Sequence, residues 1–77
     1  MVVEFKSGKI IITPHEIVVK LLGEHRVTLQ AHIDAIQLIG RGANVIAANG
    51  SETKWSLKLD SEQQLIDISK EAGLDIQ

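Results

Sequence analysis

The order of apolar and polar positions predicts short β-strands over most of the chain. Val2, Val3 and Phe5 predict a short first strand, which the turn-prone stretch Lys6-Ser7-Gly8-Lys9 ends. Ile10 to Thr13 then contains only β-branched residues. Such side chains suit a pleated sheet better than a helix. Pro14 removes a backbone donor, so the second strand should end there. We therefore predict an N-terminal hairpin.

The run from Glu16 to Leu22 predicts a third strand that is apolar on both faces. The odd positions from Ile17 to Leu21 are all aliphatic, and Val18 and Leu22 are aliphatic on the opposite face beside Lys20. Ile10 to Ile12 are also apolar on both faces. Strands of this kind have to be covered on both faces, by a helix, a second sheet or another subunit.

The next turn is predicted at Gly23-Glu24, as a two-residue type II′ turn with glycine in the first central position. The strand that follows, His25 to Gln30, alternates in polarity, with Val27 and Leu29 expected to face inward.

The segment from Ala31 to Ile39 fits more than one period. Its isoleucines are three residues apart, as in a helical turn, whereas other registers of the same run alternate as in a strand. We predict a loop or short turn over residues 31–34 and a strand from Ala35 to Ile39. Gly40-Arg41-Gly42 then predicts a flexible connection.

The clearest hairpin signal follows. Asn44 to Ala48 predicts a strand, and Asn49-Gly50 predicts a type I′ turn, because both central residues of that turn need a positive φ. A longer loop over residues 49–52 is the alternative. From Lys54 to Leu59, Trp55 and two leucines alternate with polar residues, which predicts a half-buried strand with Trp55 in the core.

One helix is predicted, over residues 61–72. Ser61 can cap it, and Gln64 three residues later completes a capping box. An apolar stripe runs along one face of this segment, and Gly73 follows as the left-handed residue that ends many helices. The apolar residues of the tail, Leu74 and Ile76, should pack back on the sheet.

Together these elements predict an α+β, β-rich domain of six or seven strands and one C-terminal helix. The connections are too short for parallel crossovers, so the strands should form an antiparallel meander. It could be an open sheet or a small barrel, and residues 1–77 should form a single domain.

Composition narrows the class of protein. The chain has 77 residues, 44% of them apolar, no cysteine and a net charge of −2. Without an excess of basic residues nucleic acid is an unlikely partner. No apolar run approaches the roughly 20 residues that cross a bilayer. The absence of cysteine fits a reducing compartment, so we expect a cytoplasmic protein.

Residues with chemical potential are dispersed. The histidines, His15, His25 and His32, lack ligand-type neighbours at metal-site spacing, and the acids and serines have turn, cap or strand explanations. We therefore expect no catalytic residues, no metal and no cofactor. The loop at Arg41 could offer a guanidinium to an anion. The speculative anion contacts are Arg41, Lys54 and Lys58.

Two resemblances accompany this interpretation. In length and in the segments Gly8–Val19 and Leu38–Asn49, the chain resembles a small uncharacterised family, a domain of unknown function typical of Vibrio-type marine gamma-proteobacteria. That family brings no activity and no site residues. The order of the elements also resembles pleckstrin-homology-like and GRAM-like domains, which implies a barrel closed by a C-terminal helix.

The surplus of apolar strand surface, without a reactive constellation, predicts a non-enzymatic interaction domain. We expect it to self-associate as a homodimer or to bind another protein through an exposed sheet face or edge strand. One alternative is a pleckstrin-like module that binds an anionic small molecule or headgroup. Another is a regulatory or nucleic-acid-associated protein.

Overall fold

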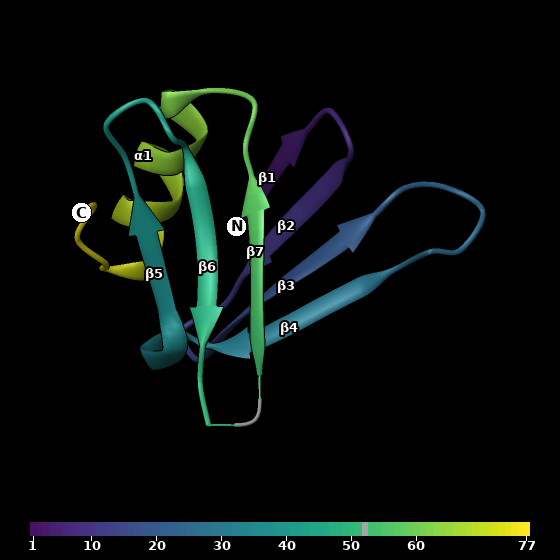
Figure 1. Cartoon of the computed structure of the whole chain (residues 1–77), viewed down its shortest axis with the longest axis horizontal. Coiled ribbons are helices and arrows are strands. Elements are labelled where there is room, and N and C mark those ends of the chain that lie inside the picture. Colours follow the sequence, from purple (N-terminus) through teal and green to yellow (C-terminus); the bar gives the residue numbers. More distant parts are fainter. Residues whose placement is uncertain (52) are drawn as a thin grey trace.

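A computed structural model describes residues 1–51 and 53–77 of the chain. These residues form seven antiparallel strands in two open sheets, with one short 3-10 helix and one C-terminal α-helix (Figure 1). The predicted α+β class is confirmed. The elements are β1 (Val2–Phe5), β2 (Gly8–Ile12), β3 (Glu16–Leu21), β4 (Thr28–His32), η1 (Ile33–Ala35), β5 (Ile36–Ile39), β6 (Val45–Asn49), β7 (Lys54–Lys58) and α1 (Glu62–Ala72).

The first sheet has the order β1-β2-β3-β4, and every strand pairs with its neighbour in sequence. Phe5 lies opposite Gly8, so the predicted N-terminal hairpin is confirmed and turns at Lys6-Ser7. Ile10 lies opposite Val19, and Val19 lies opposite Leu29. These residues face inward, which makes this side of the sheet the floor of the core.

The second sheet has the order β5-β6-β7 and lies across the first, with the strands of the two sheets crossing at a steep angle (Figure 1). No strand pairing joins the two sheets within residues 1–51 and 53–77, so the described chain forms no closed barrel. The open form of the predicted meander is therefore the one observed.

The core fills the space between the sheets and under the helix. It consists of fourteen buried hydrophobic residues in one cluster and holds no buried polar or charged residue among those described. Ile10, Ile17, Leu38, Ile46 and Leu65 are each fully buried. All five are aliphatic, as expected for a chain with so few aromatic residues.

The helix α1 closes one end of this space, where it contacts β1 and β2. Ser61 caps it by accepting a hydrogen bond from the Gln64 amide, and the Gln64 side chain accepts one from the Ser61 amide. The helix ends at Gly73, whose φ is 71°. The capping box and the C-terminal glycine are both confirmed.

The tail after the helix pairs with the edge of β5. Ile76 forms a parallel bridge with Leu38, the Gln77 amide donates to the Leu38 carbonyl at 2.8 Å, and the Gly40 amide donates to the Gln77 carbonyl at 2.8 Å. The tail therefore packs back as predicted, and it also covers an edge strand that would otherwise expose backbone groups.

The segment from Ala31 to Ile39, whose apolar spacing fits both a helical turn and a strand, forms a turn and then a strand. Residues Ala31 and His32 complete β4, η1 follows, and β5 begins at Ile36. The predicted order of turn and strand is confirmed, but the turn lies about two residues later than predicted. It is a 3-10 turn, which suits the isoleucine spacing of three.

The type I′ turn predicted at Asn49-Gly50 is wrong. Asn49 lies opposite Lys54, and the Gly50 amide donates to the Thr53 carbonyl at 2.8 Å, so the connection is longer than two residues. Neither Asn49 nor Gly50 has a positive φ. The alternative loop over residues 49–52 is right that the connection is longer, but it begins one residue too early, because Asn49 belongs to β6. Its last residue, Glu52, lies outside the described residues.

The two-residue turn predicted at Gly23-Glu24 is also wrong. The Arg26 amide donates to the Gly23 carbonyl at 3.4 Å, and Arg26 has a φ of 46°, so the turn is centred one residue later. Lys20 pairs with Thr28, which leaves Val27 beyond the ladder and 46% exposed instead of inward. The hairpin tip projects beyond β7 (Figure 1).

Replacing Ser61 with Ala should lower the free energy of unfolding by about 1 kcal/mol, because one amide of the first helical turn loses its acceptor. Chemical denaturation monitored by circular dichroism measures the change. The matched control is Ser51→Ala in an exposed loop, which should be neutral. Equal effects of the two substitutions would contradict the role of the cap.

Replacing Gly8 with Ala should cost at least about 2 kcal/mol, because the added Cβ would lie 2.0 Å from the Lys20 carbonyl oxygen, a backbone atom that cannot move alone. The control is Gly50→Ala, whose Cβ would lie 3.6 Å from that of Ala35, an ordinary contact. Thermal unfolding of both variants checks the prediction, and a Gly8 variant as stable as the Gly50 variant would refute it.

Candidate functional site

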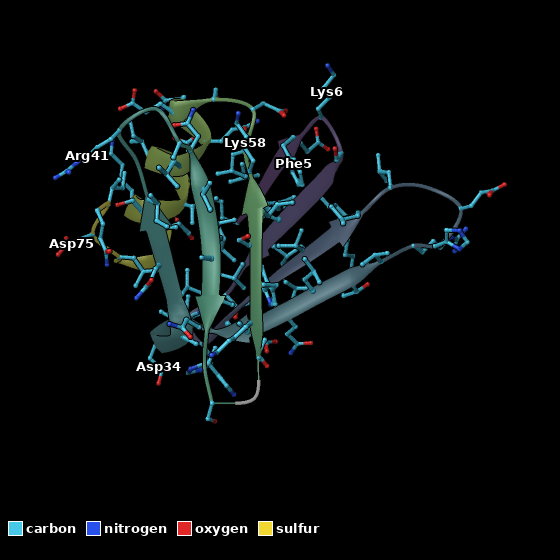
Figure 2. The ribbon with its side chains drawn as sticks, viewed as in Figure 1. Phe5, Lys6, Asp34, Arg41, Lys58 and Asp75 are labelled. Atoms are coloured by element: carbon cyan, nitrogen blue, oxygen red, sulfur yellow. The ribbon has the colours of Figure 1, made fainter. Side chains whose placement is uncertain are left out.

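The three cations proposed as anion contacts lie on the second sheet and its first turn. Arg41 is in the turn between β5 and β6, and Lys58 pairs with Val45 near that turn (Figure 2). Lys54 pairs with Asn49 at the opposite end of β7. Neither of the two clefts described below is lined by any of these cations. The structure thus brings Arg41 and Lys58 to one end of the sheet and leaves Lys54 at the other.

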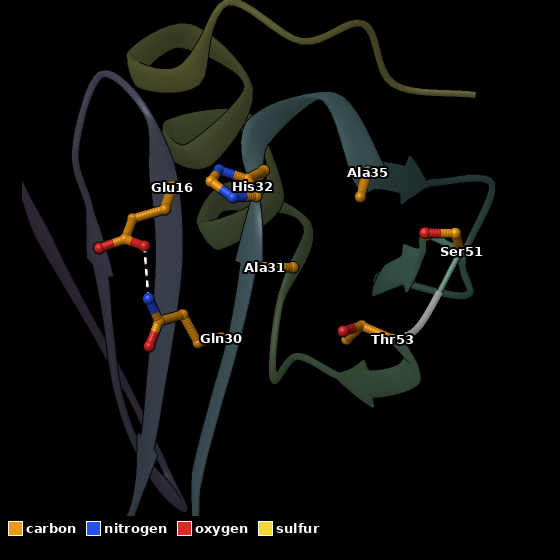
Figure 3. Close-up of a pocket in the computed structure, with 8 residues that line it drawn as sticks. Glu16, Gln30, Ala31, His32, Ala35, Ser51 and Thr53 are labelled. Carbon is orange, nitrogen blue, oxygen red and sulfur yellow. Dashed lines mark hydrogen bonds between the residues drawn. The ribbon is translucent and has the colours of Figure 1, made fainter.

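A cleft of about 370 Å³ lies between the ends of β3 and β4 and the loop between β6 and β7 (Figure 3). Glu16 and His32 lie opposite each other at this end of the first sheet, and the Gln30 side-chain amide donates a hydrogen bond to the Glu16 carboxylate. Ser51 and Thr53 line the side that belongs to the second sheet. The cleft is open to solvent, and polar and apolar groups both line it.

This cleft offers little for catalysis or metal binding. The Glu16 carboxylate already accepts the Gln30 amide, and the described residues contain no group of three or more potential metal ligands close together. His15 and His25 are exposed and are not among the residues that line it. The cleft can therefore form hydrogen bonds with a polar group. Among its described residues, no serine or threonine hydroxyl is hydrogen-bonded to a histidine or carboxylate that could activate it.

A second cleft, of about 430 Å³, lies at the tip of the β3–β4 hairpin. It is shallow, and its apolar side chains include Leu22, which is 77% exposed, and Val27. Lys20 and Arg26 flank them. Leu22 lies on the outer side of the ribbon, two residues after Lys20, so it extends the outer face of the first sheet toward the tip.

The outer face of the first sheet carries an apolar row across three adjacent strands. The pairing places Val2 opposite Ile11 and Ile11 opposite Val18, and Gln30 ends the row on β4. Val2 is 54% exposed, and Ile11 and Val18 are half-buried by their neighbours. The helix packs instead with the core, through buried Leu65. We call Val2, Ile11 and Val18 the outer row.

Charged side chains flank the outer row on both sides. Toward the hairpin tip, Lys9 and Lys20 lie directly opposite each other, and Glu4 lies opposite Lys9. On the other side, Glu16 lies opposite His32. The face is therefore basic on β3 at one side of the row and acidic on the same strand at the other.

Trp55, the predicted core residue, packs against the core cluster from the edge strand β7 and is half-buried. Its indole Nε1 is buried and has no hydrogen-bond partner among the described residues. Trp55 therefore contributes to packing at the edge of the core rather than to an exposed contact site.

The sequence indicated part of the outer row and missed the rest. The two-sided apolarity of β2 and β3 marked Ile11 and Val18, whereas Val2 and the flanking charges join them only through the hairpin registers. The two turns could have revealed the row. Pairing residues outward from the Lys6-Ser7 turn aligns β1 with β2, and pairing outward from the turn at Pro14 aligns β2 with β3.

Comparisons with known proteins give one match. The sequence model of a protein family described as "Protein of unknown function (DUF3389)" matches residues 1–76. No curated protein and no solved structure matches the chain. None of the helices in residues 1–51 and 53–77 is long and apolar enough to cross a membrane.

Proposed function

The chain belongs to the DUF3389 family of proteins of unknown function, and we propose that it is a non-enzymatic interaction domain that associates with a second copy of itself. The match confirms the expected membership of an uncharacterised family. The contact surface in this proposal is the outer face of the β1–β4 sheet, with the outer row at its centre.

The observation that carries the proposal is the alignment of Val2, Ile11 and Val18 across three strands. Single apolar residues on a surface are ordinary, but a contiguous row on a sheet face is typical of a surface that another element covers. The only α-helix of the described residues packs with the core. A second copy of the chain supplies the same row in the same geometry, as a symmetric dimer requires.

The size of this face predicts a weak dimer. Four strands about 4.8 Å apart and about five residues long cover roughly 19 by 17 Å. Such a face, roughly 320 Å² on each copy, is smaller than a standard specific interface and fits only a weak, transient complex. We expect dissociation in the micromolar range or weaker. We place this protein in the cytoplasm, because its lack of cysteine fits a reducing compartment. A weak dimer of this kind would form there where the local concentration of the protein is high.

The anion-binding alternative has less support. Its three cations, Arg41, Lys54 and Lys58, are distributed over both ends of β7 and line neither described cleft. A nucleic-acid role would need a basic surface, and the chain carries a net charge of −2. The apolar row favours a protein surface over both.

Replacing Val18 with Lys should abolish self-association, because the charge would be buried at the centre of the face. Sedimentation equilibrium at concentrations up to about 1 mM, where weak complexes form, should show the wild type approaching dimer and the variant remaining monomeric. Circular dichroism should show that both are folded.

The matched control is Ser56→Lys, which places the same charge on the exposed face of the second sheet. It should associate as the wild type does. A wild-type chain that stays monomeric over this whole range would overturn the proposal, and so would equal association of the two lysine variants.

A further inference from the structure

The charges around the outer row point to one arrangement of the two copies. We infer that the two copies pack outer face to outer face around a two-fold axis parallel to the outer row. In this arrangement Lys20 of each subunit meets Glu16 of the partner subunit. This inference rests on the proposed self-association and adds its orientation and its specific contact.

The positions along β3 carry this inference. Glu16 and Lys20 lie two residues before and two residues after Val18, so all three side chains project from the same face. At about 3.3 Å per residue, each charge lies roughly 6.6 Å from the row. The strand is thus antisymmetric in charge about its central valine.

A two-fold axis along the row turns this antisymmetry into complementarity. Each strand of one subunit then lies over the same strand of the other, running in the opposite direction. A position two residues after Val18 meets the position two residues before it. Lys20 therefore faces Glu16 of the partner subunit, and symmetry makes this contact twice.

One other two-fold arrangement that aligns the sheets is opposed by the same charges. An axis parallel to the strands, between β2 and β3, would lay Lys9 over Lys20 of the partner subunit and so bring together four ammonium groups. Like charges placed against each other across an interface oppose association and suppress wrong arrangements.

The single subunit shows why Lys20 can gain from this contact. Its cross-strand neighbours are Lys9 on one side and Thr28 on the other, a cation and a neutral hydroxyl. Directly opposed like charges destabilise a strand pair. A carboxylate brought by the partner would offset that repulsion.

Glu16 is positioned to serve as this carboxylate. It accepts the Gln30 amide through Oε2, and a carboxylate can accept further hydrogen bonds through its two oxygens. Aligned sheets pack within about 30° of each other. The long lysine side chain can follow such a rotation, so the contact does not require exact superposition of the strands.

The test reverses the two charges separately and then combines the chains. Glu16→Lys alone and Lys20→Glu alone should each weaken self-association at least about tenfold, because each homodimer would hold two like-charge contacts. A mixture of the two single variants should associate within about threefold of the wild type, since both contacts in the mixed dimer are again between opposite charges. The double variant should associate to the same extent.

Glu16→Lys separates the contact from a general charge effect. It removes the net charge of −2, which would promote association if overall repulsion were decisive, whereas the inferred contact predicts weaker association. Lys58→Glu, on the exposed face of β7, is the matched control and should associate as the wild type does. Thermal unfolding of each variant shows whether it is folded.

The outcomes separate the two proposals. If the wild type does not associate, the proposed function fails and the orientation fails with it. If the wild type associates but the single reversals do not weaken it, or the mixture does not restore it, self-association stands and this orientation is overturned. Weakening by each variant alone together with recovery in the mixture supports the inference.

Discussion

The fold depends on burying one aliphatic face of each small sheet against the other. Neither a four-stranded nor a three-stranded sheet of such short strands has an interior of its own, so Ile10, Ile17 and Val19 need Leu38 and Ile46 across the gap. The helix is added at the end that the sheets leave open. Because the described core holds no buried polar residue, its specificity comes from shape and from the registers of the strands rather than from a polar network.

The same constraint explains why a second apolar surface is noticeable. Once the inner faces and the helix have been joined, residues 1–51 and 53–77 contain no further element with which to cover the outer face of the first sheet. Val2, Ile11 and Val18 are all β-branched, so they also favour the extended backbone of their own strands. This preference for strands does not explain why the three residues align in one row, with a basic position of β3 on one side of it and an acidic position on the other.

The elements could be predicted from the sequence because each has its own local signal. The alternation from Lys54 to Leu59 and the Ser61 capping box are examples. Two of the turns could not be predicted, because several turn types fit Gly23 or Asn49 and cross-strand register selects among them. Part of the candidate site could be predicted, because the apolar and charged positions of β3 can be read directly from the sequence. The row across three strands could not, because it depends on how β1 pairs with β2 and how β2 pairs with β3. Of the three predicted cations, Lys54 lies apart from Lys58 because a strand carries residues four apart to its opposite ends.

The meander order has a consequence for how the chain reaches this structure. Every strand within a sheet pairs with its neighbour in sequence, and the tail bridge to Leu38 is a pairing between distant segments. The entropic cost of closing each hairpin loop is therefore small. Topologies dominated by such local contacts fold fast. Hairpins can therefore form early within each sheet, but neither sheet is stable without the other. We expect the packing of the two sheets with the helix and tail, which joins distant parts of the chain, to be the slow and cooperative step.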